Sequence, residues 1–509
     1  MKISRTKNAI RNVKFGGILR IYQIVWPFAI RTIMIYLLGV QYVGLNSLFT
    51  SILQVLNMTE LGVGTAMVFS MYKPIAEDDT DTICQLLHLY KIYYRCIGLF
   101  IAVIGLAITP IIPQLIADQS SIPLNITKLY WLNLINTVMT YWLFAYRNSV
   151  FIAHQRDDVI SKVSILSCSI TYVLQILLLL AWKNYYLYLI ASILGQLLNN
   201  LIINSLAKKM YPQYSARGEV SPDIKKSITK KVMDLFTARV GGTIQNSADA
   251  VVISAFLGLT LLGKYNNYYY VMNSVFMFVN ILFTSSLGGV GNSIALDSKD
   301  KIFSDFKRLT FITEWVVCIC ASCMTCLFQD FIRFWVGESN LISFSIVICI
   351  VINFVVICNN QMFCLYKDGA GMWHEDRFRP LVTAIVNLAL NLLSVSKFGL
   401  YGVILSTVIS LAFLGSPWLL HNLFKVVFDR QLSDYLLYYF KLLLAGIFSI
   451  ICAYGACQFV RFNSLIGIIV KLIVSLLVSN TILWILLNKD EQYYLSLNLV
   501  KKFLKKNCM

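Results

Sequence analysis

Charged residues are scarce in this 509-residue chain. Only 13% of the residues are Asp, Glu, Lys or Arg, whereas 58% are hydrophobic and the mean hydropathy is +0.69. Soluble domains carry about 25% charged residues, so this composition excludes an ordinary soluble protein. Polar stretches of domain size are also missing between the apolar runs. We therefore expect a polytopic membrane protein whose chemistry lies in helices and short loops.

Motifs for nucleotide and metal chemistry are missing as well. No Walker loop occurs, which excludes ATP as the direct energy source. The Cys318, Cys320, Cys323 and Cys326 spacing lies in an apolar segment with no histidine nearby, so it does not predict a metal site. The cysteines fall within expected spans or on the inner side, so no disulfide framework is expected. We expect no cofactor.

Apolar segments long enough to cross about 30 Å of hydrocarbon recur along the whole sequence. We expect an all-α protein with fourteen spans, at approximately 18–39, 45–69, 96–116, 128–150, 161–182, 187–206, 232–258, 264–290, 308–328, 342–366, 380–396, 400–423, 440–460 and 465–487. The even number places both termini on one side of the membrane.

The distribution of Lys and Arg residues predicts on which side of the membrane the termini lie. With these spans, 33 of the 43 Lys and Arg residues lie on the side of the termini and six lie opposite. By the positive-inside rule both termini are cytoplasmic, and the net charge of +18 requires no nucleic-acid partner. The basic N-terminal segment is followed by no small-residue cleavage site, so we expect the first span to be retained.

The longest polar segment, 207–231, carries seven Lys and Arg residues, two prolines and a glycine. It is typical of a cytoplasmic linker. We expect an N-lobe of six spans over 1–206, a C-lobe of six spans over 232–423, and two accessory spans with a cytoplasmic amphipathic tail over 424–509.

A further cytoplasmic helix is expected after the second span. Asp81 would cap it. One apolar face would lie in the membrane interface, and it comprises Ile83, Leu86, Leu87, Tyr90 and Tyr94.

The two lobes carry an internal repeat. LGVQYVGLN (Leu38 to Asn46) and LGLTLLGKYN (Leu257 to Asn266) both place two glycines five residues apart, at expected outer turns. Glycine clusters follow in both second spans, at 62–64 and 288–291. Two parallel halves of this kind place a substrate site between them in transporters. The clusters, together with Pro27 and Gly241-Gly242, suit either hinges or close helix packing.

The run RTIMIYLLGVQYVGLNSLFTSILQVLNMTELGVGTAMVFSMYKPIAE (Arg31 to Glu77) resembles the start of the bacterial polysaccharide-biosynthesis flippases. The later NLALNLLSVSKFGLYGVILSTVIS (Asn387 to Ser410) resembles the eleventh and twelfth spans of that family. The resemblance implies the fold of the multidrug/oligosaccharidyl-lipid/polysaccharide exporter superfamily, with two six-helix lobes around a central cavity and two accessory helices.

The resemblance also implies a function. The chain would be a transporter of the bacterial inner membrane that carries an undecaprenyl-pyrophosphate-linked oligosaccharide repeat unit to the outer leaflet, by alternating access. Its partners would be that lipid-linked oligosaccharide, membrane lipids and polysaccharide polymerase machinery, and it would act as a monomer. A lipid II flippase and a cation-coupled multidrug antiporter of the same fold are alternatives, and the coupling ion is left open between a proton and sodium.

Charged side chains inside the membrane cost about 2.5–3.5 kcal/mol each on insertion scales, so each is a functional candidate. By the helical rise, Arg31 and Asp249 lie about 12 and 13.5 Å below their outer turns, and Glu60 and Arg239 lie about 24 and 28 Å below theirs. We expect the pairs Arg31–Asp249 and Glu60–Arg239 to bridge the lobes in alternation. The freed guanidinium groups would bind pyrophosphate. Pairing within each lobe, as structural ion pairs, is the alternative.

Neutral polar residues close to these charges add a hydrated surface. Gln245, Asn246, Asn266 and Asn267 offer both donors and acceptors to sugar hydroxyls, although they also suit helix packing. The tyrosines at 265 and 268–270 favour an interfacial aromatic belt over sugar stacking. A membrane enzyme acting on the same lipids is disfavoured, because no outer loop exceeds about fifteen residues, which is short for an active-site domain.

Overall fold

The computed structural model describes residues 5–60, 62–460 and 464–498. Over these ranges the chain is helical and contains no strand. This confirms the expected all-α polytopic membrane fold. Contacts divide the chain into two compact units, Met1–Gly263 and Lys264–Met509. The lobe boundaries expected from the sequence at 207–231 and 424 stay a prediction.

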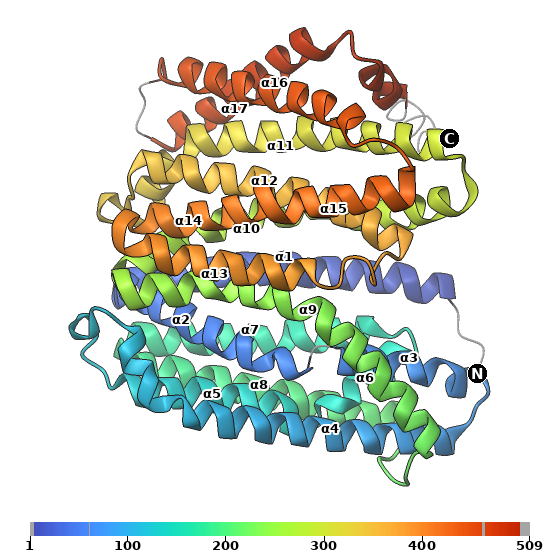
Figure 1. Ribbon diagram of the computed structural model, residues 1–509. Coiled ribbons are helices and arrows are strands. Elements are labelled where there is room, and N and C mark those ends of the chain that lie inside the picture. Colours follow the sequence, from blue (N-terminus) through green and yellow to red (C-terminus); the bar gives the residue numbers. More distant parts are fainter. Residues whose placement is uncertain (1–4, 61, 461–463, 499–509) are drawn as a thin grey trace. The chain divides into compact units, whose positions relative to one another are not determined.

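The first unit contains nine helices over its described residues. They are α1 (Arg5–Leu37), α2 (Val40–Leu56), α3 (Val63–Ala76), α4 (Thr80–Ala107), α5 (Ile126–Trp142), α6 (Asn148–Ala153), α7 (Asp157–Trp182), α8 (Tyr185–Met210) and α9 (Pro222–Leu257). Helix α4 packs on α5, which packs on α8, and α7 lies between α8 and α1 (Figure 1).

The second unit begins within α10 (Leu259–Leu296), because the first turn of this helix belongs to the first unit. Its other helices are α11 (Lys299–Val336), α12 (Phe344–Ala370), α13 (Arg379–Phe398), α14 (Leu400–Ile409), α15 (Ser416–Leu423), α16 (Ser433–Cys457) and α17 (Leu465–Leu487). Two π-helical segments, at Ser410–Gly415 and Phe424–Phe428, continue α14 and α15. Helix α11 contacts α12, α16 and α17 (Figure 1).

Eleven helices of the described chain are long and apolar enough to cross a membrane. They correspond to eleven of the fourteen expected spans. The remaining three coincide with the broken pairs α2/α3 and α5/α6 and with α9, whose first half is polar.

The predicted interfacial helix is not a separate element. Helix α4 begins at Thr80 and continues without interruption through the third span. Its cap is Asp79 rather than Asp81, because the Asp79 carboxylate accepts a hydrogen bond from the Thr82 backbone N–H at 3.0 Å. The predicted apolar face is correct, but all five residues are buried within the protein rather than placed on a membrane surface. The predicted C-terminal tail helix lies largely outside the described residues.

The hinge interpretation of the glycines and Pro27 holds at one position. Helices α1, α9 and α10 run continuously through Pro27, Gly241-Gly242 and the 288–291 cluster. In α10 Gly291 serves packing, since a Cβ built on it would lie 3.5 Å from the Gly369 carbonyl oxygen of α12, whereas nothing lies within 4 Å of a Cβ on Gly288 or Gly289. Only at Gly62, with φ 97°, is the helix interrupted.

The sequence repeat has a direct structural counterpart. Gly39 and Gly258, which end the first helix of each repeat, adopt nearly the same conformation, with φ/ψ of 108°/160° and 89°/166°. Five residues later the two following helices cross at glycine. A Cβ on Gly44 would lie 2.1 Å from the Leu259 carbonyl oxygen, and one on Gly263 would lie 2.2 Å from the Val40 carbonyl oxygen. The contact is reciprocal, since each glycine lies against the backbone of the other helix where α2 crosses the start of α10.

The segment between α4 and α5 stabilises this crossing through hydrogen bonds. The Asp118 carboxylate accepts a hydrogen bond from the Leu259 backbone N–H at 2.7 Å, at the first turn of α10. Ser254 Oγ donates to the Leu115 carbonyl oxygen at 2.7 Å. The turn between α9 and α10 is therefore fixed by residues 115–118.

At the N-terminal end of α7, a buried carboxylate joins α7 to α1. Asp158 is fully buried and is surrounded by Arg11 at 3.2 Å, Arg156 at 2.9 Å and Lys162 at 3.1 Å. Asn12 completes the contact by accepting from the Asp158 backbone N–H. The three basic groups compensate for the desolvation of the acid, which would otherwise be costly.

The glycine crossing yields the first prediction. Gly44→Ala should lower the free energy of unfolding by about 1–3 kcal/mol, because the added methyl group has no room against Leu259. Gly17→Ala is the matched control, since nothing lies within 4 Å of a Cβ at Gly17, and alanine favours a helix. Thermal unfolding of the purified protein measures both, and equal midpoints for the two variants would contradict the crossing.

The docking of the first accessory helix yields the second prediction. A Cβ built on Gly446 of α16 would lie 3.8 Å from Cys318 Cβ of α11, a separation typical of a disulfide. Gly446→Cys should therefore form a disulfide with Cys318 under oxidation in membranes, detected as a linked peptide pair by mass spectrometry. Gly455→Cys, on the same helix with nothing within 4 Å, is the control. A similar low yield of linkage to Cys318 in both variants would place α16 elsewhere.

Candidate functional site

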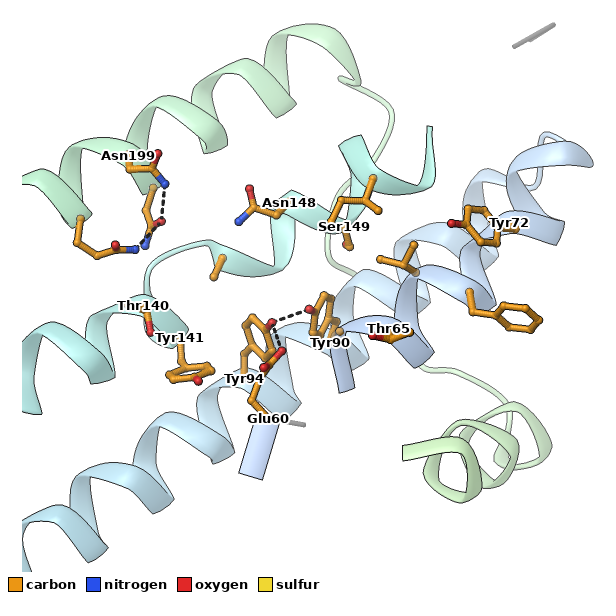
Figure 2. A pocket seen from close by; sticks show the side chains of 17 residues that line it. Glu60, Thr65, Tyr72, Tyr90, Tyr94, Thr140, Tyr141, Asn148, Ser149 and Asn199 are labelled. Carbon is orange, nitrogen blue, oxygen red and sulfur yellow. Dashed lines mark hydrogen bonds between the residues drawn. The ribbon is translucent and has the colours of Figure 1, made fainter. Parts of the chain in front are cut away.

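A cavity of about 730 Å³ opens within the first unit around Glu60. We refer to it as the Glu60 cavity. Side chains from α3, α4, α5, α6 and α8 form its walls (Figure 2). The lining residues are Glu60, Gly64, Thr65, Val68, Phe69, Tyr72, Tyr90, Tyr94, Thr140, Tyr141, Ala145, Asn148, Ser149, Ile152, Gln196, Asn199 and Asn200.

Two broken spans meet at this cavity. In the second span, α2 ends in a short 3-10 helix, Asn57–Glu60, and α3 restarts after Gly62. In the fourth span, α5 stops at Trp142 and the chain passes through Phe144, with φ 57°, before it resumes as α6. At the first break, the glycines at 62–64 left a hinge and close helix packing open as alternatives. The sequence predicted no break in the fourth span, because no glycine or proline lies between 143 and 147.

Glu60 is held by a chain of tyrosine hydroxyl groups. Tyr90 donates to the Tyr94 hydroxyl oxygen at 2.6 Å, and Tyr94 donates to Glu60 Oε1 at 3.0 Å (Figure 2). Tyr141 packs edge-on against Tyr94 and donates to Asn57 Oδ1 at 3.2 Å. The hydroxyl donor offsets part of the cost of an acid at membrane depth.

Gly64 makes this arrangement possible. A Cβ at position 64 would lie 3.0 Å from the Tyr90 hydroxyl oxygen and 3.2 Å from Glu60 Oε1. Any larger side chain would have to displace one of these two groups. The glycine therefore serves the site as well as the helix break.

The opposite wall carries amides. Gln196 Nε2 donates to Asn200 Oδ1 at 3.2 Å, and Asn199 Oδ1 accepts from Ser167 Oγ at 2.9 Å. Asn148 Oδ1 is buried without a hydrogen-bond partner among the described residues. Among the described lining residues no lysine, arginine or histidine occurs. The cavity thus offers one acid, several hydroxyl groups, amides and aromatic rings.

The residues expected from the sequence are distributed unevenly around this site. Of them, Glu60 alone lines the cavity among the described residues. Arg31 lies on α1, within electrostatic range of Tyr188 of α8. Asp249 and Gln245 lie on α9, partly buried. Pairing of Arg31 with Asp249 stays a prediction.

The other expected residues belong elsewhere. The side chains of Arg239 and Asn246 lie outside the described residues, so the Glu60–Arg239 pair is untested. Asn266 and Asn267 lie on α10 in the second unit, where Asn267 is fully buried.

The aromatic-belt interpretation is wrong for Tyr268. Its side chain is fully buried, and its hydroxyl donates to Gln329 Oε1 of α11 at 2.9 Å. This tyrosine packs α10 on α11 and does not face lipid.

The sequence analysis missed most of the cavity wall. Tyr90 and Tyr94 were assigned only to an apolar helix face, because a tyrosine ring satisfies that pattern whatever its hydroxyl does. The adjacent amides Asn199 and Asn200 carried a usable signal, since polar pairs inside an apolar span are costly.

Comparison with known proteins supplies the fold relationship. No family model matches the sequence, and no curated protein matches it. A solved structure of the lipid II flippase MurJ in an inward closed conformation superposes with a TM-score of 0.66 at 14% identity, covering 93% of this chain and 98% of that one. An inward-facing multidrug resistance MATE family transporter of the MOP superfamily gives 0.62 at 13% identity, covering 79% and 94%.

A MOP superfamily transporter from Pyrococcus furiosus, described as having a binding pocket of reversed polarity, gives a TM-score of 0.55 at 11% identity, covering 84% and 97%. These identities are low, so the likeness is one of fold. The chain has the fold of the MOP superfamily transporters.

The hydrogen bond to Glu60 yields the third prediction. Tyr94→Phe removes both the donor to Glu60 and the acceptor of the Tyr90 hydroxyl, and it should lower the free energy of unfolding by about 1.5–3 kcal/mol. Tyr141→Phe, which removes a donor to the neutral Asn57, should cost about 0.5–1.5 kcal/mol. Unfolding of the purified variants measures the difference. In a Glu60→Gln background the cost of Tyr94→Phe should fall, because the hydroxyl then donates to a neutral amide, and an unchanged cost would show that Glu60 carries no charge there.

Proposed function

We propose that the chain is a flippase that moves an undecaprenyl-pyrophosphate-linked oligosaccharide repeat unit from the cytoplasmic to the outer leaflet of a bacterial inner membrane. The observation that carries this proposal is the lining of the Glu60 cavity. Sugars present hydroxyl groups that both donate and accept, as do amides and tyrosines, and they present apolar ring faces that pack on aromatic side chains. The volume of about 730 Å³ lies within the range of ligand sites and suits a short oligosaccharide.

The fold supports a lipid substrate. The match to a protein titled a lipid II flippase extends over 93% of this chain, whereas the MATE match extends over 79%. The two accessory helices α16 and α17 pack directly on α11 and extend the second unit beyond six spans. A lipid II flippase of the same fold is therefore a close alternative within this class.

The pyrophosphate requires cations, and the described cavity lining has none. In the proposed mechanism Arg31 and Arg239 bind the head group while the sugars occupy the cavity. Arg31–Asp249 and Glu60–Arg239 would form in turn as the lobes alternate. Gln245, Asn246, Asn266 and Asn267 would add sugar contacts. The chain would act as a monomer, without a cofactor, beside the polymerase machinery.

A cation-coupled multidrug antiporter is the second candidate, and one observation favours it. Glu60 is the one ionisable acid among the described lining residues, and it lies among tyrosines, as a site for an apolar cation would require. The amides on the opposite wall favour the sugar instead. Both candidates are transporters rather than enzymes.

The fourth prediction separates these two functions. Deletion of the gene in its native host should cause a lipid-linked oligosaccharide to accumulate on the cytoplasmic leaflet, measured by lipid extraction and mass spectrometry. Expression of the Asn199→Leu variant in the deletion strain should fail to relieve the accumulation, because the substitution removes a cavity amide. Asn204→Leu, on the same helix outside the cavity lining, should relieve it.

A different set of results would identify the antiporter. No accumulated intermediate, combined with increased sensitivity to cationic drugs that Glu60→Gln fails to reverse, would replace the flippase with the antiporter.

A further inference from the structure

A second acid is buried in the membrane, far along the chain from the Glu60 cavity. Glu314 lies on α11, fifteen residues after its first residue Lys299, or about 22 Å along the helix axis. The residue is only 7% exposed. Its Oε1 atom has no hydrogen-bond partner among the described residues.

Neutral groups surround this carboxyl. From α12, the Asn359 amide lies beside it, and Cys358 is within electrostatic range. From α16, Tyr435 and Tyr439 are within electrostatic range. On α11 itself, Cys318 lies one turn away. All of these groups are uncharged at neutral pH in an apolar environment.

The charged residues of the helices packed on α11 are engaged elsewhere. On α17, Lys471 is paired with Asp330, and on α16, Lys441 is paired with Asp490. On α12, Lys367 is paired with Asp368 and Asp376. On α11 itself, Lys307 lies over the Phe303 and Tyr438 rings, Arg308 is paired with Asp305, and Arg333 is paired with Asp330 and Glu338. Lys425, in the π-helical segment that contacts α11, and Asp434 of α16 are solvent-exposed.

An ionised carboxylate in these surroundings would have a polar amide beside it but no cation to compensate its charge. Burial of an isolated charge costs far more than burial of a neutral acid, so the group takes up a proton instead. A divalent metal ion is an unsuitable occupant, because no group of three or more His, Cys, Asp or Glu residues gathers anywhere in the described chain.

We propose that Glu314 is a proton-binding site at the junction of α11, α12 and the accessory helix α16. The neutral carboxyl is compatible with the close packing of these three helices. Release of the proton would leave a charge beside Tyr435, Tyr439 and Asn359, and it would require water or a cation to enter between the helices. The site lies wholly within Lys264–Met509, and the proposal does not depend on which substrate the protein carries.

Infrared difference spectroscopy of the purified full-length protein tests this site, as the fifth prediction. A protonated carboxylic acid has a C=O stretch that carboxylates lack. At neutral pH, where exposed glutamates have ionised, the wild type should retain such a band, and the band should disappear at higher pH. Glu314→Gln should abolish this component, and Glu338→Gln should leave it unchanged, because Glu338 is 78% exposed and paired with Arg333.

A second variant covers the case in which Glu314→Gln does not fold. Asn359→Leu removes the polar neighbour that favours the ionised acid, so its band should persist to higher pH than in the wild type. Absence of the band from wild type at neutral pH would overturn the proposal. So would a band that is unchanged in Glu314→Gln, or a band that sodium chloride removes at constant pH when choline chloride does not, which would identify a sodium site.

Discussion

The constraint on which the first unit depends is that backbone polar groups inside a membrane must find partners. An interrupted helix is tolerated there only where it is buried in protein or lines a cavity. Both interruptions of the first unit, at 57–62 and 143–147, occur at the Glu60 cavity. The left-handed Gly62 directs the second span away from its first half, and Glu60 lies at that point. The acid and the two broken helices therefore meet at one cavity, which is where an interrupted span is tolerated.

Patterns with a single physical cause were predictable from the sequence. Apolar length predicted eleven of the fourteen expected spans as long apolar helices, and a 3.6-residue period predicted the buried face of α4 from Ile83 to Tyr94, because both depend only on burial. The repeat at Gly39 and Gly258 was visible because only glycine readily adopts their positive φ. The break at Phe144 was not visible in the sequence, since tertiary contacts rather than local preference hold a bulky residue in a conformation with positive φ. Pro27 does not interrupt α1, because neighbouring groups in a membrane helix can compensate for the hydrogen bond that proline removes.

The candidate site was predictable only in part, for a related reason. Glu60 stood out because a charge inside an apolar run is costly, whatever surrounds it. Its partners did not stand out, since Tyr90 and Tyr94 satisfy an apolar period and reveal their hydroxyl contacts only in three dimensions. Tyr141 and Asn199 reach the site because of how α5 and α8 pack together with α4. The position of a residue along its own helix does not reveal that packing.

Glu60 and Glu314 show two solutions to the same cost. Glu60 receives a hydroxyl donor and lies against a cavity that a ligand or a charged partner can enter, so its ionised form can be compensated in place. Glu314 lies among closely packed neutral groups, and its compensation has to come from a proton. Burial of the acid therefore says little by itself, and the donors on the neighbouring helices decide its role. The accessory helix α16 supplies both tyrosines near Glu314, Tyr435 and Tyr439. It therefore forms part of the environment that sets the protonation of Glu314, in addition to extending the surface of the second unit.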